Sequence, residues 1–123
     1  MDKFQAIQNF WSSFGLEAYD ESTVPTGEYK PELPYITYDT AISSLNSPIY
    51  LHGSLWYYSA SWVKITEKLI EIENYLGRGG VTLLIDEGAV WIRKGYPFAQ
   101  RMGDPDDMIR RIYINLEAEF LTA

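Results

Sequence analysis

Apolar side chains recur at helical spacing at the beginning of the chain. Within residues 2–14 they fall at positions i, i+3, i+7 and i+10, separated mostly by polar side chains: Phe4, Ile7, Trp11 and Phe14. This spacing predicts an amphipathic helix with Asp2 as its N-cap and Gly15 beyond its end. Residues 16–19 are expected to form a short strand. Residues 20–34 hold three prolines, a glycine and four acidic residues, a composition typical of a surface loop.

From residue 35 the apolar period changes to two, which is the period of a strand. The alternation predicts a strand over residues 35–42, with one face formed by Ile36, Tyr38, Thr40 and Ile42. Turn-forming residues at 43–48 separate it from a second predicted strand at 49–58, so the two form an antiparallel hairpin. Large apolar side chains occupy both faces of the second strand. We expect both faces to be covered, by helices of the same domain or by another subunit.

The most regular periodicity lies in the middle of the chain. Apolar residues at i, i+3, i+7, i+10 and i+14 predict the inward face of a second helix: Trp62, Ile65, Leu69, Ile72 and Leu76. Ser59 or Ser61 is expected to cap this helix, and the glycines among residues 77–80 are expected to end it.

A second hairpin and a long last strand are predicted for the remainder of the chain. Apolar residues alternate at 81–85 and 90–92 around a short turn at 86–88. A loop is expected next, marked by Gly95, Pro97, Gly103 and Pro105. The strand predicted at 108–120 has one buried and one solvated face. This grouping predicts an α+β fold, with a mainly antiparallel sheet built from two hairpins and a long C-terminal strand, packed on two helices in a single domain of residues 1–123.

The composition excludes several kinds of active site. The chain has no cysteine and one histidine, His52, which excludes thiol nucleophiles, disulfides and zinc sites of cysteine or several histidines. His52 lies in mid-strand and is interpreted as structural. The acids Asp104, Asp106 and Asp107 lack calcium-loop spacing and are interpreted as turn caps. We therefore expect no enzymatic activity, metal or cofactor. No apolar stretch approaches the ~18 residues of a membrane span and no signal peptide is evident, so we expect a soluble protein made in a cytosol.

Charge and aromatic residues are distributed in a way that favours self-association. The net charge of −7 argues against gripping a nucleic-acid backbone. Residues 1–60 carry two basic and seven acidic side chains, whereas residues 88–111 carry five basic and three acidic ones, so one region attracts the other in a neighbouring copy. The alternative is an ordinary solvated surface with uneven charge.

The chain also holds 15% aromatic residues, more rings than one core of this size buries easily, so some are expected to face a partner. The alternative is that these rings lie partly exposed around one monomer core. The interface residues predicted from charge and aromatic content together are Trp56, Tyr58, Trp91, Arg93, Lys94, Arg101, Arg111, Asp20, Glu21 and Glu28.

Four stretches of the chain, in this order and spacing, carry a family resemblance. They read YDESTVP at residues 19–25, LPYITY at 33–38, VWIRKGYPF at 90–98 and IRRIYINL at 109–116. With the leading helix and a helix that ends in glycine, they resemble the small tail terminator and head-to-tail joining proteins of long-tailed bacteriophages, which are often labelled minor capsid proteins. The resemblance covers nearly the whole chain.

The resemblance implies an α+β fold and a hexameric ring that caps the tail tube, stops its polymerisation and receives the head connector. The implied partners are other copies of the chain, the tail tube protein and the head connector proteins. The implied location is the head–tail junction of the virion, after assembly in the host cytoplasm. DNA passes through such a ring without specific binding, and an acidic lumen would repel its phosphates.

Tail terminators and neck proteins both fit this resemblance, and two other functions stay open. One is a small α+β module that binds an apolar ligand or peptide between its sheet and its helices. The other is a hydrolase that uses the carboxylates of residues 104–107.

Overall fold

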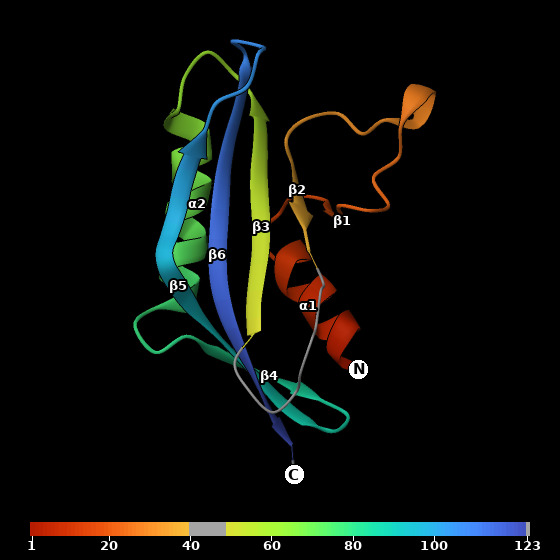
Figure 1. Cartoon of the computed structure of the whole chain (residues 1–123), viewed down its shortest axis with the longest axis vertical. Coiled ribbons are helices and arrows are strands. Elements are labelled where there is room, and N and C mark those ends of the chain that lie inside the picture. The colour runs from red at the N-terminus through yellow and green to blue at the C-terminus, as the bar shows by residue number, and fades with distance from the viewer. Residues whose placement is uncertain (40–48, 123) are drawn as a thin grey trace.

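The computed structural model describes residues 1–39 and 49–122, and it has the α+β fold expected from the sequence (Figure 1). The elements are α1 Lys3–Ser12, β1 Ala18–Asp20, a 3-10 turn Gly27–Tyr29, β2 Tyr35–Tyr38, β3 Ile49–Tyr58, α2 Val63–Leu76, β4 Val81–Ile85, β5 Gly88–Met102 and β6 Ile109–Thr122. The turn predicted at 43–48, and the end of the strand predicted before it, lie outside the described residues. In the part of the chain described, neither helix has the length and apolar character needed to cross a membrane.

The six strands form one sheet in the order β1-β2-β3-β6-β5-β4. β1 runs parallel to β2, and the other neighbouring pairs are antiparallel. The predicted antiparallel pairs β2–β3 and β4–β5 are confirmed. The C-terminal strand β6 joins them, since it pairs with β3 on one side and with β5 on the other. β1 and β4 are therefore the edge strands of this sheet.

Both helices contribute to one core on the same side of the sheet, and α2 lies behind β5 and β6 in Figure 1. The register places Leu51 of β3 opposite Leu116 of β6, and both are fully buried. A Cβ atom on Gly53 would lie 2.5 Å from the ring of Trp11 in α1. Glycine at this strand position therefore makes room for Trp11, whose indole stacks on Tyr38.

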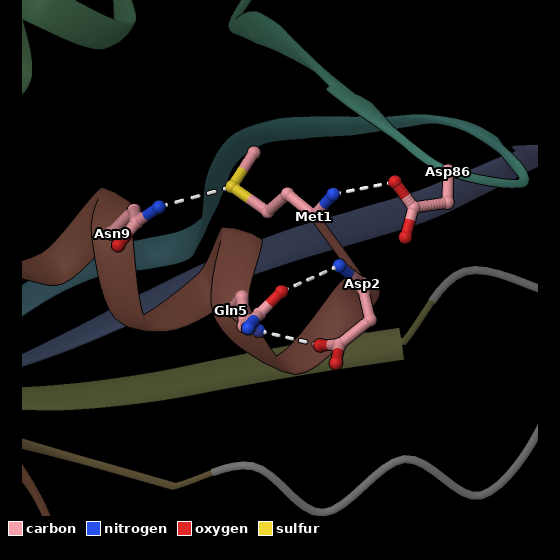
Figure 2. Close-up of polar contacts among 5 residues, drawn as sticks. All are labelled: Met1, Asp2, Gln5, Asn9 and Asp86. Carbon is pink, nitrogen blue, oxygen red and sulfur yellow. Dashed lines mark hydrogen bonds and ion pairs between the residues drawn. The ribbon is translucent and has the colours of Figure 1, made fainter.

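A capping box holds the beginning of α1, with Asp2 as the N-cap that the sequence predicts. Asp2 Oδ1 accepts a hydrogen bond from the Gln5 backbone N–H at 2.8 Å, and Gln5 Oε1 accepts one from the Asp2 N–H at 2.9 Å (Figure 2). The Met1 amino group pairs with the Asp86 carboxylate in the β4–β5 turn, and the Asn9 amide donates to the Met1 sulfur. These contacts fix α1 against the β4 edge of the sheet.

Gly95 and Pro97 belong to a strand, so the predicted loop begins later than expected: of its four marker residues, only Gly103 and Pro105 lie between β5 and β6. β5 continues through both, with a bulge between Lys94 and Ala99. Lys94 pairs with Leu116, and the next paired residue of β5, Ala99, pairs with Ile114. Between these two pairs β5 therefore has more residues than the opposite segment of β6. A Cβ on Gly95 would lie 2.9 Å from the Asn115 carbonyl oxygen, and the Asn115 amide donates to the Pro97 carbonyl. Glycine and proline here mark a bulge within a continuing strand.

The predicted inward faces of the helices need two corrections. Phe4 is 50% exposed, because it lies in the first turn of α1 beside a cavity at the β4–β5 turn. Phe10 is buried in its place, and its ring meets Phe14 edge-on. Trp62, just before α2, and Leu69 within it pack against the core but are only partly buried.

Candidate interaction surfaces

The face of the sheet opposite the helices carries aromatic and charged side chains. Alternation along β6 sends Arg111 and Tyr113 to this face, and the register sets Trp56 of β3 opposite Arg111. Tyr50 and Tyr58, also on this face of β3, are 64% and 60% exposed. Within the described residues the helices therefore cover one face of β3 and not both. Cover of the other face by another subunit, the second expected possibility, stays a prediction.

Trp56 and Arg111 form a fixed pair on this helix-free face. The Arg111 guanidinium lies 4.6 Å from the centre of the Trp56 ring, a cation–π distance. Arg111 Nε donates to Ser54 Oγ at 3.1 Å, and Trp56 Nε1 donates to Thr37 Oγ1 at 2.9 Å. Because each side chain is held by a hydrogen bond as well as by stacking, neither loses much conformational freedom on meeting a partner.

Trp91 and Arg93 form a second pair on the same face, but this pair is neutralised within the chain. Arg93 lies 4.2 Å from the Trp91 ring centre, and its Nε donates to Glu117 Oε2 at 3.0 Å. A second carboxylate, that of Glu119, lies 3.8 Å from Arg93 Nη1. The predicted interface residue Lys94 points to the other side of the sheet, where its Nζ lies 3.7 Å from Glu73 of α2.

Two further arginines stack on Trp62, just before α2. The guanidinium of Arg101 lies 4.6 Å from the Trp62 ring centre and that of Arg110 lies 5.2 Å from it. Arg110 Nη2 donates to the Ala60 carbonyl at 2.8 Å. A shallow cavity of about 350 Å³ opens here, lined by Trp62, Val63, Thr66, Glu67 and Arg101.

Helical periodicity predicts Trp62 in the core, and Arg110 is not among the predicted interface residues. The alternation along β6 could have identified Arg110 from the sequence. Arg110 falls on the same face as Ile112 and Ile114, which are buried. A charged residue on a buried face needs a specific partner, and the nearest aromatic residue at the start of α2 supplies one.

The acidic loop, residues 21–34, leaves the sheet on the β1 and β2 side and extends away from the body of the molecule (Figure 1). Its acidic side chains at Glu21, Glu28 and Glu32 are exposed. Glu28 lies in the 3-10 turn at the outer end of the loop. At the base of the loop, Asp20 Oδ1 accepts hydrogen bonds from the backbone and hydroxyl of Ser22.

Tyr113 lies next to Arg111 on the helix-free face, and the Arg111 guanidinium is 5.9 Å from the centre of the Tyr113 ring. Burial raises the pKa of the Tyr113 phenol above its usual value, Glu21 raises it further, and Arg111 opposes both effects. The His52 ring stacks on Tyr113 with a centroid distance of 5.4 Å. The mid-strand position predicted for His52 is confirmed, in β3.

The structure divides the predicted interface residues among separate regions. The pairing positions of Trp56 and Trp91 on β6 are residues 111 and 119, so the two pairs are about 27 Å apart at ~3.4 Å per residue. Arg101 and Lys94 lie on the helix side of the sheet, whereas Asp20, Glu21 and Glu28 belong to the β1 edge and its loop. The predicted residues therefore do not form one continuous patch.

The carboxylates of residues 104–107 serve the turn between β5 and β6. Asp104 Oδ1 accepts from the Asp106 backbone N–H at 2.9 Å, and Asp106 Oδ1 accepts from the Met108 N–H at 2.8 Å. Both bonds are typical of acidic residues that close a turn. A cavity of about 230 Å³ lies far from them, between the first turn of α1 and the β4–β5 turn.

Comparison of the chain with models of known protein families and with curated proteins finds no match.

Proposed function

We propose that this chain is a virion assembly protein of a long-tailed bacteriophage, and that its copies form a ring that ends the tail tube and joins the tail to the head. The sequence resemblance supplies the family and the hexameric number. The observation that carries the proposal is the presence of two unlike, separated surfaces. Three arginines stacked on tryptophans lie at one end of the sheet, and an exposed acidic loop leaves its other side.

Unlike surfaces on one molecule favour a ring over a simple dimer. A contact between two identical patches is complete with two copies, whereas a contact between two different patches leaves a free patch at each end. Further copies then add until the rotation closes. Charge complementarity sets the register and the rate of encounter in such a contact, and buried aromatic anchors supply most of the affinity.

The acidic composition suits the proposed location at the head–tail junction. A net charge of −7 repels the phosphates of DNA that passes through the ring, so passage is not slowed by tight binding. The partners in this proposal are other copies of the chain, the tail tube protein and the head connector proteins. Assembly takes place in the host cytoplasm, and no enzymatic step or cofactor is part of it.

Solution mass tests the proposal. Sedimentation velocity and native mass spectrometry at rising protein concentration, with and without isolated tail tubes, should detect a closed oligomer. Six copies of 14.2 kDa give about 85 kDa for the cyclic hexamer. We expect closure to need high concentration or the tube end. A chain that stays monomeric at millimolar concentration and in the presence of tubes contradicts the proposal and favours the ligand-binding module.

A further inference from the structure

Six of the ten basic side chains of this protein fall into two groups. Arg93, Lys94 and Lys68 each pair with a glutamate of the same chain. Arg101, Arg110 and Arg111 stack on tryptophans instead, and no carboxylate among the described residues forms an ion pair with them. Acidic residues outnumber basic ones by 17 to 10. In such a chain, three neighbouring arginines without an acidic partner indicate a surface that is completed from outside.

These three arginines gather at one end of the sheet. Arg101 of β5 pairs in register with Ile112, and Met102 pairs with Arg111, so the arginines occupy adjacent strands within two residues of one another. Arg101 and Arg110 lie on the helix side against Trp62, whereas Arg111 lies on the other face against Trp56. We call this region the arginine–tryptophan end, defined by Trp56, Trp62, Arg101, Arg110 and Arg111.

We infer that the arginine–tryptophan end binds the acidic loop, residues 21–34, of a second copy of this chain. The inference rests on the proposed function and names the two surfaces that would close the ring. Charge complementarity selects the occupant, because the loop presents exposed Glu21, Glu28 and Glu32 against one lysine. Two strands, β3 and β6, separate β2, where the loop ends, from β5, which carries Arg101. The contact therefore joins the β1–β2 side of one copy to the β5 side of its neighbour.

The chemistry of the two surfaces suits this contact. A guanidinium that stacks on an indole keeps its edge free to donate hydrogen bonds to a carboxylate. Stacking also fixes the arginine in advance, which reduces the conformational entropy lost on binding. The shallow cavity beside Trp62 and Arg101 offers an apolar surface next to the charges. The exposed Pro25 of the loop supplies an apolar ring that can lie against this surface.

The absence of cysteine from the chain allows a direct test by site-specific cross-linking. One variant is Thr26→Cys, close to Glu28 in the acidic loop. The other is Val63→Cys, in the wall of the cavity beside Trp62, where Val63 is 61% exposed. Both substitutions leave every charge in place. The two full-length variants are purified separately, mixed at low salt and treated with a short bis-maleimide reagent.

We expect a cross-linked dimer in the mixture and none in either variant alone, because the contact joins unlike surfaces. The matched control is Asn74→Cys, which also leaves every charge in place, at an exposed position in the last turn of α2, about 17 Å from Val63 at 1.5 Å per residue. Mixed with Thr26→Cys, it should give no cross-link. Raising the salt during mixing should reduce the yield of the Thr26–Val63 product several-fold.

Each other outcome decides a separate point. No cross-link in the mixture, while solution mass shows a ring, overturns the inference and leaves the proposed function standing. Equal cross-linking in the single-variant samples also overturns it, because the contact would then join identical surfaces. No cross-link together with a monomeric mass overturns both. A cross-link in the mixture without a closed oligomer supports the inference and contradicts ring closure.

Discussion

The two ends of the helix-free face use the same pair of residues for different purposes. At one end Arg93 stacks on Trp91 and is then neutralised by Glu117 and Glu119. At the other end Arg111 stacks on Trp56, and the hydroxyl groups of Ser54 and Thr37 accept a hydrogen bond from each member of the pair. We call the first the closed end, and we call the arginine–tryptophan end, to which the second pair belongs, the open end. Where the chain supplies a carboxylate to the arginine, the arginine–tryptophan pair is a structural element. Where it does not, the pair is a candidate contact site for another molecule.

Removal of the counter-charge at the closed end should have the largest effect on stability. Glu117→Ala leaves the largely buried Arg93 guanidinium with Glu119 alone, at 3.8 Å. We expect the free energy of unfolding to fall by about 1.5–3 kcal/mol, the usual contribution of a hydrogen bond to a charged group. Urea denaturation measures this loss. A change below about 0.5 kcal/mol, the range of ordinary surface substitutions, would mean that the closed end is not a structural element.

Loss of the indole N–H at the open end should have an intermediate effect. Trp56→Phe keeps an aromatic ring beneath Arg111 but removes the donor to Thr37 Oγ1, which is largely buried. We expect a loss of about 0.5–1.5 kcal/mol in the free energy of unfolding, measured by thermal and urea denaturation. Trp56→Ala also removes the stacking surface and should weaken association in addition. Equal association of the two variants would exclude Trp56 as an anchor.

Truncation of an arginine at the open end should barely change stability. Arg101→Ala removes a side chain that stacks on Trp62 and pairs with no carboxylate among the described residues. We expect the free energy of unfolding to stay within about 0.5 kcal/mol of the wild-type value, while association weakens. The matched substitution Arg93→Ala should do the reverse, with a clear loss of stability. If both variants lose the same stability, the distinction between the two ends fails.

Alkaline pH should weaken the fold slightly through buried tyrosines. Burial raises the pKa of Tyr35, Tyr38, Tyr57 and Tyr113 in the folded state. The unfolded chain therefore releases these protons first, and the free energy of unfolding falls as the pH rises above about 10. Tyr57→Phe, which removes one titrating hydroxyl, should make the decline shallower. An unchanged decline in this variant would show that Tyr57 does not contribute.

Elements of the fold that depend on local pattern were predictable from the sequence. The periodicity of Ile65, Ile72 and Leu76 fixes the inward face of α2, and the bounds of β3 agree with the predicted strand at 49–58. The bulge in β5 was not predictable, because Gly95 and Pro97 signal a loop until the close approach of Asn115 is known. Local signals identify residues that break regular structure, but tertiary contacts decide whether a strand continues across them.

The candidate surfaces were predictable only in part. Trp56, Arg101 and Arg111 could be selected because charge and aromatic content are properties of the sequence. Their separation from Arg93 and Lys94 depends on which carboxylates lie across the sheet or on α2, and register and helix docking decide that. Trp62 fits helical periodicity as a core residue, yet its place just before α2 leaves it only partly buried, beneath two guanidinium groups.

The most direct test of the open end is a charge-exchange cycle measured by the concentration dependence of association. Arg101→Glu and Glu28→Arg are compared singly and combined in one chain, with Arg78→Glu as a control of equal charge change at an exposed site outside both surfaces. Each single reversal should weaken association about tenfold or more at low salt, the combined chain should regain most of the loss, and the control should behave as the wild type. Losses that simply add in the combined chain would contradict a contact between the acidic loop and the arginine–tryptophan end.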